Sequence, residues 1–487
     1  MRSRIARVEY KWLVATAFVF GIFMDLLDIT IVNVALPTLG KEFNASSNGL
    51  EWIVTGYLLS LAIWIPASGW LGDRIGTKKV FMFALATFVV GSALCALSWN
   101  LESMVAFRIL QGVGGGMLTP VGNTMLFRAF PPAERAQASI VLTVPTVIAP
   151  ALGPVLGGFF VDYVSWHWIF LVNLPIGIAG FFFTWAFVHE EKGEETVPFD
   201  VPGFVLAGGG LALILFALSR GPVEGWSSAI VLATGGVGVV MALALVIVEL
   251  KSRHPMLDLR LLGDRMFRNA NIVFFTMIGG LMGVVFLLPL LLQNLRGLSA
   301  MDTGLLLMPQ AVAVMVFAPL SGKLYPKVGP KRMLAFSLVV FAISSFMFVA
   351  VDLETNLLWL LPIMVLRGLA MAFTFIPLQA AAFATIKPQD TGMASSIFNT
   401  NRQVASSIGI AILATVLTER TAHHISGAAT EAAAQQGALL GFHDAFIASG
   451  ILAIIGIFFA LIIHDEDAAA SMQGFAVEGE AEPAMIH

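Results

Sequence analysis

The sequence predicts an all-α, polytopic membrane protein with fourteen transmembrane helices, arranged as two six-helix bundles plus two additional central helices. Three observations carry this prediction. Of the 487 residues, 58% are apolar and only 12% are charged, whereas about a quarter of the residues of a soluble domain are charged. Apolar runs of about 20 residues, the length that spans a bilayer, recur along the whole chain. A loop motif of the first half recurs in the second half, which indicates an internal repeat. The composition therefore excludes a soluble globular protein.

The apolar runs follow one another with only short connections between them. They lie at about residues 12–36, 50–71, 79–98, 104–127, 136–161, 167–188, 202–219, 228–249, 269–293, 303–322, 333–351, 357–382, 391–417 and 443–463. The longest connections, at about 189–201, 251–268 and 418–442, are too short to fold as separate domains. The chain also contains no G-x-x-x-x-G-K-S/T phosphate-binding loop. If it moves a solute, it must therefore use an ion gradient or work passively.

The distribution of positive charge predicts the orientation of the chain. If the N-terminus is cytoplasmic, 20 of the 27 Lys and Arg residues lie in segments on the cytoplasmic side, four lie on the opposite side, and three lie within spans. Because positive residues are enriched in cytoplasmic loops, we expect both termini to be cytoplasmic.

A repeated loop motif divides the chain. GWLGDRIGTKK at 69–79 recurs in weaker form, with an offset of 253 residues, as GKLYPKVGPKR at 322–332. We therefore predict an N-terminal six-helix bundle at 1–190, a linker with two extra transmembrane helices at 191–268, a C-terminal six-helix bundle at 269–464 and a disordered cytoplasmic tail at 465–487.

Other residues point away from several function classes. The net charge of -4 offers no basic surface for nucleic acid. The single cysteine, Cys95, cannot form an internal disulfide. The pair His423 and His424, with His443, is the best grouping for a metal, but its spacing is not that of a metal site, and we predict no bound metal. An integral-membrane enzyme acting on lipid is disfavoured, because the loops carry no His, Asp and Glu cluster with catalytic spacing, and we assign no catalytic residues.

Five short motifs follow one another on the predicted helices and loops. They are LDITIVNVALP at 27–37, the loop residues Gly69, Leu71, Asp73, Arg74, Gly76 and Lys78, FRILQGVGGG at 107–116, ALGPVLGG at 151–158, and WHWIFLVNLPIG at 166–177. In this order they resemble the major facilitator superfamily, and specifically its fourteen-helix multidrug:proton antiporter branch. The sequence departs from that pattern at Asp25, Thr77, Ala149 and His167, where the branch more often has an apolar residue, a basic residue, glycine and arginine.

Two carboxylates lie on the first predicted helix, Asp25 and Asp28, one turn apart and therefore on nearly the same face. A carboxylate inside a membrane is costly and usually functional. The resemblance implies that Asp28 is the proton site, whereas Asp25 is an extra carboxylate that we expect to tune which charges are accepted. A structural ion pair or a water-lined wall would also explain both residues.

Arg108 lies at a depth on the fourth helix that matches the depth of Asp28, so the two side chains can pair. The resemblance implies that this arginine takes part in proton transfer, and Gln111, one turn further, can extend the hydrogen-bonded path. The alternative is an arginine that extends to the outer membrane interface.

Two further groups belong to the conformational cycle. Pro150, Gly153, Pro154, Gly157 and Gly158 predict a thin, bent fifth helix that a neighbour can approach closely, and their resemblance to the antiporter motif favours export. Small-residue packing alone would also explain the glycines. The loop set Gly69, Asp73, Arg74, Gly76 and Lys78 is expected to form a cytoplasmic gate; ordinary positive-inside bias explains its basic residues but not Asp73 or the glycines.

The thirteenth helix carries a polar stripe that includes Asn399, Arg402 and Gln403. Such a stripe faces protein or water rather than lipid, and either cavity lining or structural hydrogen bonding explains it. With Asp25 and Asn33, these residues form the predicted substrate cavity.

The resemblance implies a proton-coupled efflux antiporter in the inner, cytoplasmic membrane of a bacterium, with lipophilic, cationic substrates and antibiotic resistance as the outcome. Its partners would be those substrates, protons and the bilayer, and its cofactor would be none beyond the proton gradient. A dedicated exporter of one metabolite, peptide or lipid fits the same motifs. The sequence is compatible with a periplasmic adaptor but identifies none.

Overall fold

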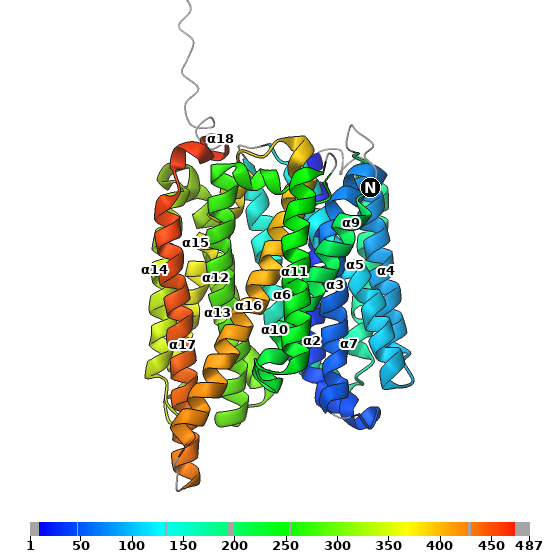
Figure 1. Ribbon diagram of the computed structural model, residues 1–487. Coiled ribbons are helices and arrows are strands. Elements are labelled where there is room, and N and C mark those ends of the chain that lie inside the picture. Colours follow the sequence, from blue (N-terminus) through cyan, green and yellow to red (C-terminus); the bar gives the residue numbers. More distant parts are fainter. Residues whose placement is uncertain are drawn as a thin grey trace, which may run out of the picture.

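The computed structural model describes residues 9–45, 47–131, 134–192, 199–252, 255–426 and 430–472, and within these ranges it contains helices and no strands (Figure 1). The helices of the first half are α2 (Tyr10–Glu42), α3 (Ser47–Ile75), α4 (Thr77–Ala96), α5 (Leu101–Ala129), α6 (Arg135–Tyr163), α7 (Trp168–Leu171) and α8 (Asn173–Phe187). Those of the middle segment are α9 (Val201–Phe204), α10 (Gly210–Glu224) and α11 (Ala229–Lys251), with a π-helical turn at Val205–Gly209 between α9 and α10.

The second half has the same order of long helices. They are α12 (Arg265–Leu290), α13 (Ala300–Val328), α14 (Pro330–Met347), α15 (Leu360–Ala382), α16 (Thr391–Ile425) and α17 (Glu431–Ile462), followed by the short α18 (Ala469–Met472). A π-helical turn extends α12 to Leu295, and 3-10 turns lie at Leu259–Gly263, Phe348–Ala350, Leu357–Trp359, Pro388–Asp390 and Asp465–Ala468.

Within the described ranges, twelve helical segments are long and apolar enough to cross a membrane. The helices α5 and α6, which carry the glycine-rich and proline-rich motifs, are not among these twelve. Both nevertheless pack inside the same bundle, α5 against α3 and α4, and α6 against α2 and α13. The chain is therefore a multi-pass membrane protein, and the predicted fourteen crossings are compatible with this arrangement.

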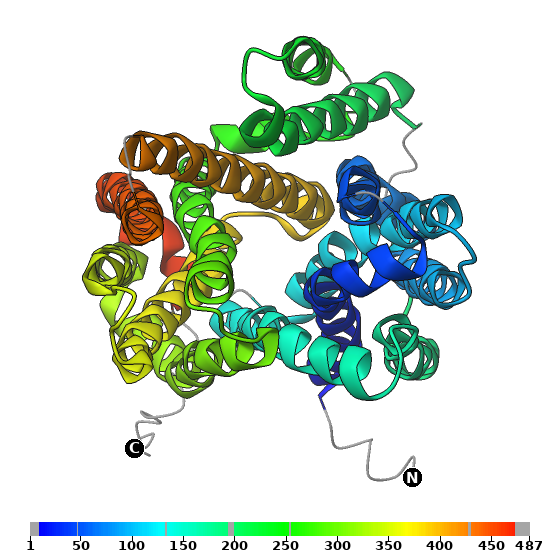
Figure 2. The same ribbon diagram turned by 90° about the horizontal axis from the view of Figure 1, so that it is seen from below.

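The two halves lie side by side, as Figure 2 shows along the bundle axis. They meet where α6 packs on α13 and α15, and where α16 packs on α3 and α5. The α10–α11 pair lies outside both halves and contacts them through α3 and α16 (Figure 2). The described start of the chain and α18 lie at the same end of the bundle (Figure 1), as an even number of crossings requires.

The prediction of a disordered tail from residue 465 is wrong for its first eight residues. Residues 465–472 form helical turns because polar groups attach them to the second half: Asp465 accepts a hydrogen bond from the Lys331 amide at 2.9 Å, and Asp467 pairs with Arg265 at 2.8 Å. The remaining residues of the predicted tail, 473–487, lie outside the described ranges.

Candidate functional site

A buried ion pair lies between α2 and α5. Asp28 is 0% exposed and Arg108 is 1% exposed, and Arg108 Nη1 lies 2.5 Å from Asp28 Oδ2. The depths read from the sequence predicted this contact, and the structure places the two residues in it. The alternative, an arginine that extends to the membrane interface, does not fit a side chain with almost no exposed surface.

Neutral donors complete the coordination of the Asp28 carboxylate. Gln111 Nε2 donates to Asp28 Oδ1 at 3.0 Å, and Asn173 Nδ2 donates to the same oxygen at 2.9 Å. Gln111 Oε1 also accepts from Arg108 Nη1 at 2.7 Å. Hydrogen bonds of this kind compensate for the water that a buried carboxylate loses. These four residues, which we call the Asp28 network, hold one carboxylate by three donors.

The guanidinium of Arg108 rests on aromatic rings. Its carbon lies 4.2 Å from the centroid of Tyr57 and 5.8 Å from that of Phe170. This close packing depends on glycine, since a Cβ on Gly112 would lie 2.7 Å from the Tyr57 carbonyl oxygen. The glycines of the fourth-helix motif therefore bring α3 close enough to cover Arg108.

Asp25 occupies a separate polar setting one turn away on α2. The Tyr57 hydroxyl donates to Asp25 Oδ1 at 2.5 Å, and the Thr119 hydroxyl donates to Oδ2 at 3.4 Å. Arg402, on α16 of the other half, acts electrostatically on Asp25 but forms no ion pair with it. Tyr57 thus contacts Asp25 with its hydroxyl and Arg108 with its ring face, and it links the two charged sites.

The other predicted cavity residues differ in exposure. Asn33 is exposed, Arg402 and Gln403 are partly buried, and Asn399 is buried. The amide of Asn399 donates to the Ser395 carbonyl at 2.8 Å and that of Asn33 to the Ile29 carbonyl at 3.0 Å. Both asparagines therefore use one donor on their own helix, and for Asn399 this is the structural hydrogen bonding that was the alternative to cavity lining.

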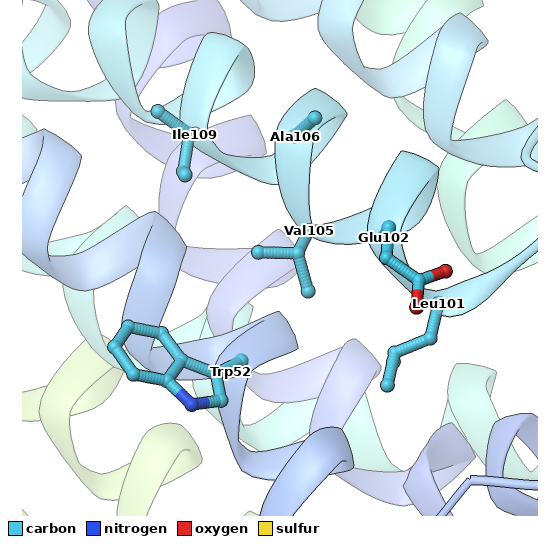
Figure 3. Close-up of a pocket in the computed structure, with 6 residues that line it drawn as sticks. All are labelled: Trp52, Leu101, Glu102, Val105, Ala106 and Ile109. Carbon is cyan, nitrogen blue, oxygen red and sulfur yellow. The ribbon is translucent and has the colours of Figure 1, made fainter.

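A shallow depression of about 340 Å³ lies between α3 and α5 (Figure 3). It is lined by Trp52, Leu101, Glu102, Val105, Ala106 and Ile109. Glu102, Ala106 and Ile109 are exposed and share one face of α5, whereas Arg108 and Gln111 are buried. The depression is therefore separate from the Asp28 network.

The predicted gate contacts the other half of the molecule. Asp73 Oδ1 accepts from Arg128 Nη2 at 2.7 Å, and Arg128 Nε donates to the Pro388 carbonyl at 3.3 Å. Beside them, the Gly69 amide donates to the Ser396 hydroxyl at 3.0 Å. The two halves are therefore joined at the end of the bundle that carries the described N-terminal end.

The remaining gate residues bond within the first half. Lys78 Nζ donates to the Trp185 carbonyl at 2.9 Å, and Arg74 lies over the Trp70 ring at 5.6 Å. Gly76 has a φ of 113°, a backbone angle that favours glycine. These three residues shape the loop, whereas Gly69 and Asp73 face the interface.

The motif on α6 contains one close approach among the glycines whose surroundings are described. A Cβ on Gly153 would collide with Thr30 of α2, whereas a Cβ on Gly158 would meet nothing within 4 Å. Gly158 therefore does not serve the close approach that was predicted for it. Gly157 is buried, and the side chains of Pro150 and Pro154 lie outside the described residues.

Sequence reasoning missed four polar partners: Tyr57, Thr119, Asn173 and Arg128. Asn173 lies inside the motif at 166–177, so that motif could have suggested it. The others give no local signal, because the rotation of each helix decides which neighbour its polar side chain meets.

Comparisons with a family model, with relatives and with a solved structure all point to membrane transporters. The family model described as Major Facilitator Superfamily matches residues 18–410. A multidrug resistance protein B homolog of Mycobacterium tuberculosis is 33% identical over 405 residues, which is 82% of this chain and 75% of that protein. A putative multidrug resistance protein MdtD of Salmonella paratyphi A is 34% identical over 410 residues, which is 83% of this chain and 85% of that protein. The crystal structure of the human organic anion transporter MFSD10 (TETRAN) is similar in fold, with a TM-score of 0.66, 15% identity, and coverage of 92% of this chain and 99% of that chain.

Proposed function

Because the chain belongs to the major facilitator superfamily of membrane transporters, we propose that it is a proton-coupled antiporter that exports lipophilic cations by alternating access. The names of the multidrug resistance relatives support export of more than one compound. The residues of the first half support the choice of ion, since a buried carboxylate held by one arginine is a suitable proton carrier. No bound cofactor and no enzymatic step enters this proposal.

The Asp28 network is the observation that carries the proposal. While Asp28 is ionised, Arg108 balances its charge. A proton that binds Asp28 removes that balance and frees Arg108, whose charge then rests on the Tyr57 and Phe170 rings. Gln111 and Asn173 can hydrogen-bond either form of the carboxyl group through their amides. Protonation therefore changes the contacts of Arg108, which packs on both α3 and α7. This change is the step that couples the proton to movement.

Asp25 is the proposed contact for the cationic substrate. It lies across from Arg402 of the second half, so an arriving cation and Arg402 compete for the same carboxylate. Asn33, Asn399 and Gln403 complete the proposed substrate cavity. A second carboxylate near Asp28 also helps to offset a second positive charge on a divalent substrate.

The gate supports the alternating-access part of the proposal. Opening the cytoplasmic side requires the Arg128–Pro388 and Gly69–Ser396 contacts to break, because they join the two halves. The Asp73–Arg128 pair holds Arg128 in the position from which it reaches Pro388. Gly153 allows α6 to stay close to α2 as the halves rock.

An efflux panel tests the proposed function. Cells that lack their own pumps are given the wild-type chain or Asp28→Asn and are exposed to cationic dyes and antibiotics. We expect reduced accumulation of several lipophilic cations with the wild type and none of this protection with the variant. Protection against one compound only would favour a dedicated exporter, and no protection by an expressed wild-type protein would contradict the proposal.

Labelling tests the proposed orientation in the cytoplasmic membrane. In a Cys95→Ser background, single cysteines replace Lys192, Lys387 or Arg420, all of which are exposed. With both termini cytoplasmic, the cysteine at 420 reacts with an impermeant thiol reagent in intact cells, and those at 192 and 387 do not. The reverse pattern would overturn the topology.

A further inference from the structure

Arg367 is a second fully buried arginine, and among the described residues no carboxylate pairs with it. It lies on α15, is 1% exposed, and packs on the rings of Phe341 at 4.5 Å and Phe348 at 5.7 Å. Its Nη1 donates a long hydrogen bond to the Ser345 hydroxyl at 3.4 Å. Its Nη2 is buried without a hydrogen-bond partner. A buried cation without a counter-charge is costly, so this arrangement requires an explanation.

The internal repeat relates this site to the Asp28 network. Ser345 follows Ser92 by 253 residues, the same offset that relates the two loop motifs. In the first half Ser92 lies 3.1 Å from Asn173, and in the second half Ser345 lies 3.5 Å from Ser449. Arg108 and Arg367 both lie on the fourth long helix of their half. The two halves thus share an arginine, a serine and a polar residue in matching places.

The carboxylate is the part that the second half lacks. At the same offset of 253 residues, the counterpart of Asp28 on α12 is the buried and uncharged Leu281. Beside it, the Ser449 hydroxyl donates to the Gly280 carbonyl at 3.0 Å. A Cβ on Gly280 would lie 3.5 Å from Phe341 and 3.6 Å from Ser449 Oγ. The sequence of α12 contains no acid, so this helix offers no counter-charge to the cluster of Arg367, Ser345 and Ser449, which we call the Arg367 cluster.

The chemistry of the Arg367 cluster suits a small anion. Arg367 Nη2 has a free donor, and the hydroxyls of Ser345 and Ser449 can rotate to donate to a new acceptor. Hydrogen bonds from an ionised donor are stronger than those between neutral groups. A monovalent anion would also balance the single positive charge of Arg367. The neighbours Gly280 and Phe341 leave little space, so the ligand must be small.

We propose that the Arg367 cluster binds a small monovalent anion, which supplies the negative charge that Asp28 supplies to Arg108 in the first half. The shared chemistry is one negative charge and one or two acceptor atoms, supplied by chloride or by the carboxylate of a small solute. This site lies in the half that carries no proposed proton carrier, and it does not depend on the proposed export of cations.

Equilibrium binding to the purified full-length chain tests the site. Radioactive chloride should bind at about one per chain, and Arg367→Met should weaken the binding by about tenfold or more, the loss expected for one charge-assisted hydrogen bond. Arg367→Lys keeps the charge and should retain part of the binding. The matched control is Arg332→Met, which removes an exposed positive charge from the same half. Competition between labelled chloride and acetate distinguishes the two candidate anions. If acetate displaces the labelled chloride at a lower concentration than unlabelled chloride does, the ligand is a carboxylate. If acetate competes only weakly, the ligand is chloride.

Thermal unfolding gives a second readout. Sulfate serves as the non-binding anion, because it is too large and carries two charges. In sodium sulfate, at the same ionic strength as the chloride and acetate buffers, Arg367→Met should unfold at a higher temperature than the wild type, because it removes an uncompensated charge. Chloride or acetate should reduce this difference by stabilising only the wild type. The proposal is overturned if neither anion binds and both proteins respond equally to the salts, or if Arg367→Met and the wild type bind chloride equally. If Arg367→Met does not fold, anion binding and unfolding temperature are measured instead for Arg367→Lys and Ser449→Ala and are judged in the same way against the wild type.

Discussion

The two halves of the molecule share their helix order but differ in where they bury charge. Among the described residues, the first half buries the acids Asp25 and Asp28, whereas the buried polar residues of α12–α17 include no acid. The second half instead contributes Arg367, without a carboxylate, and Arg402, which faces Asp25 across the interface. The repeat therefore preserves the order of the helices, while the buried acids described in the two halves lie in the first half alone.

The two repeated loops show the same division. In each half the amide of the repeated lysine, Lys78 or Lys331, donates to an acid that follows the sixth long helix, Glu190 at 3.2 Å or Asp465 at 2.9 Å. The first loop also takes part in a polar contact with the other half, since Asp73 holds Arg128 against the carbonyl of Pro388. The second loop meets the other half through an apolar contact, Gly322 against Ile140. The hydrogen bond from the lysine amide is therefore common to both halves, whereas the charged contact between halves is described at the first loop.

The largest expected effect separates the two acids of the first half. Asp28→Asn should bind a cationic substrate with little dependence on pH yet fail to concentrate it, because the proton no longer competes. Asp25→Asn is the matched variant and should keep proton-driven export of neutral or monovalent compounds while it loses mainly divalent cations. Substrate binding between pH 5 and 8 and uptake into inverted vesicles measure both. Uphill export by Asp28→Asn, with none by Asp25→Asn, would reverse the assignment.

The next prediction compares the two buried arginines. Arg108→Met leaves Asp28 buried without its partner, and the cost of breaking such a pair is about 3–5 kcal/mol. Arg367→Met breaks no ion pair within the described chain and should not destabilise by that amount. Thermal unfolding followed by tryptophan fluorescence in one buffer compares them. Equal losses of stability in Arg108→Met and Arg367→Met would contradict the view that only Arg108 is held by a buried ion pair.

A third prediction concerns the gate. Asp73→Asn removes the negative partner of Arg128, and a hydrogen bond between charged groups contributes about 1.5–3 kcal/mol, so turnover should fall by about tenfold or more while substrate affinity changes little. Gly76→Leu should act in the same direction, because a φ of 113° strains any residue with a side chain. Lys327→Met, in the corresponding loop of the second half, is the control. Lost affinity with normal transport rates would place these residues in the binding site instead.

The smallest expected effect concerns the Arg265–Asp467 ion pair of the second half. The hydrogen bond from Arg265 lowers the pKa of Asp467 below its ordinary value. The stability that this contributes is therefore present above the pKa of the unfolded chain and is lost as the pH falls through the pKa of the folded protein. Because the pair is partly exposed to solvent, Asp467→Asn should lower the unfolding temperature only slightly at pH 7. The two unfolding temperatures should converge in acid; a difference that grows as the pH falls would contradict this sign.

The sequence was sufficient to predict the helical class, the repeat and the meeting of Asp28 with Arg108, because apolar runs and the depth of a residue can be read directly. It was not sufficient to predict Tyr57 as the link between Asp25 and Arg108, since that contact depends on how α3 is rotated against α5. Arg128 appeared to be one more cytoplasmic positive charge, and its role at the gate depends on a carbonyl 260 residues away. The tail from residue 465 was predicted to be disordered, and the contacts of Asp465 with the repeated loop and of Asp467 with Arg265 explain the helical turns at 465–472.

Proton flux in liposomes that contain only this protein tests whether Asp28 couples proton movement to cation export. A pH-sensitive dye inside the vesicles reports protons, and a lipophilic cation such as tetraphenylphosphonium is added on one side. With the wild-type protein and with Arg332→Met, we expect a proton flux that requires the cation, and with Asp28→Asn we expect no flux. A cation-dependent proton flux of normal size through Asp28→Asn would contradict it.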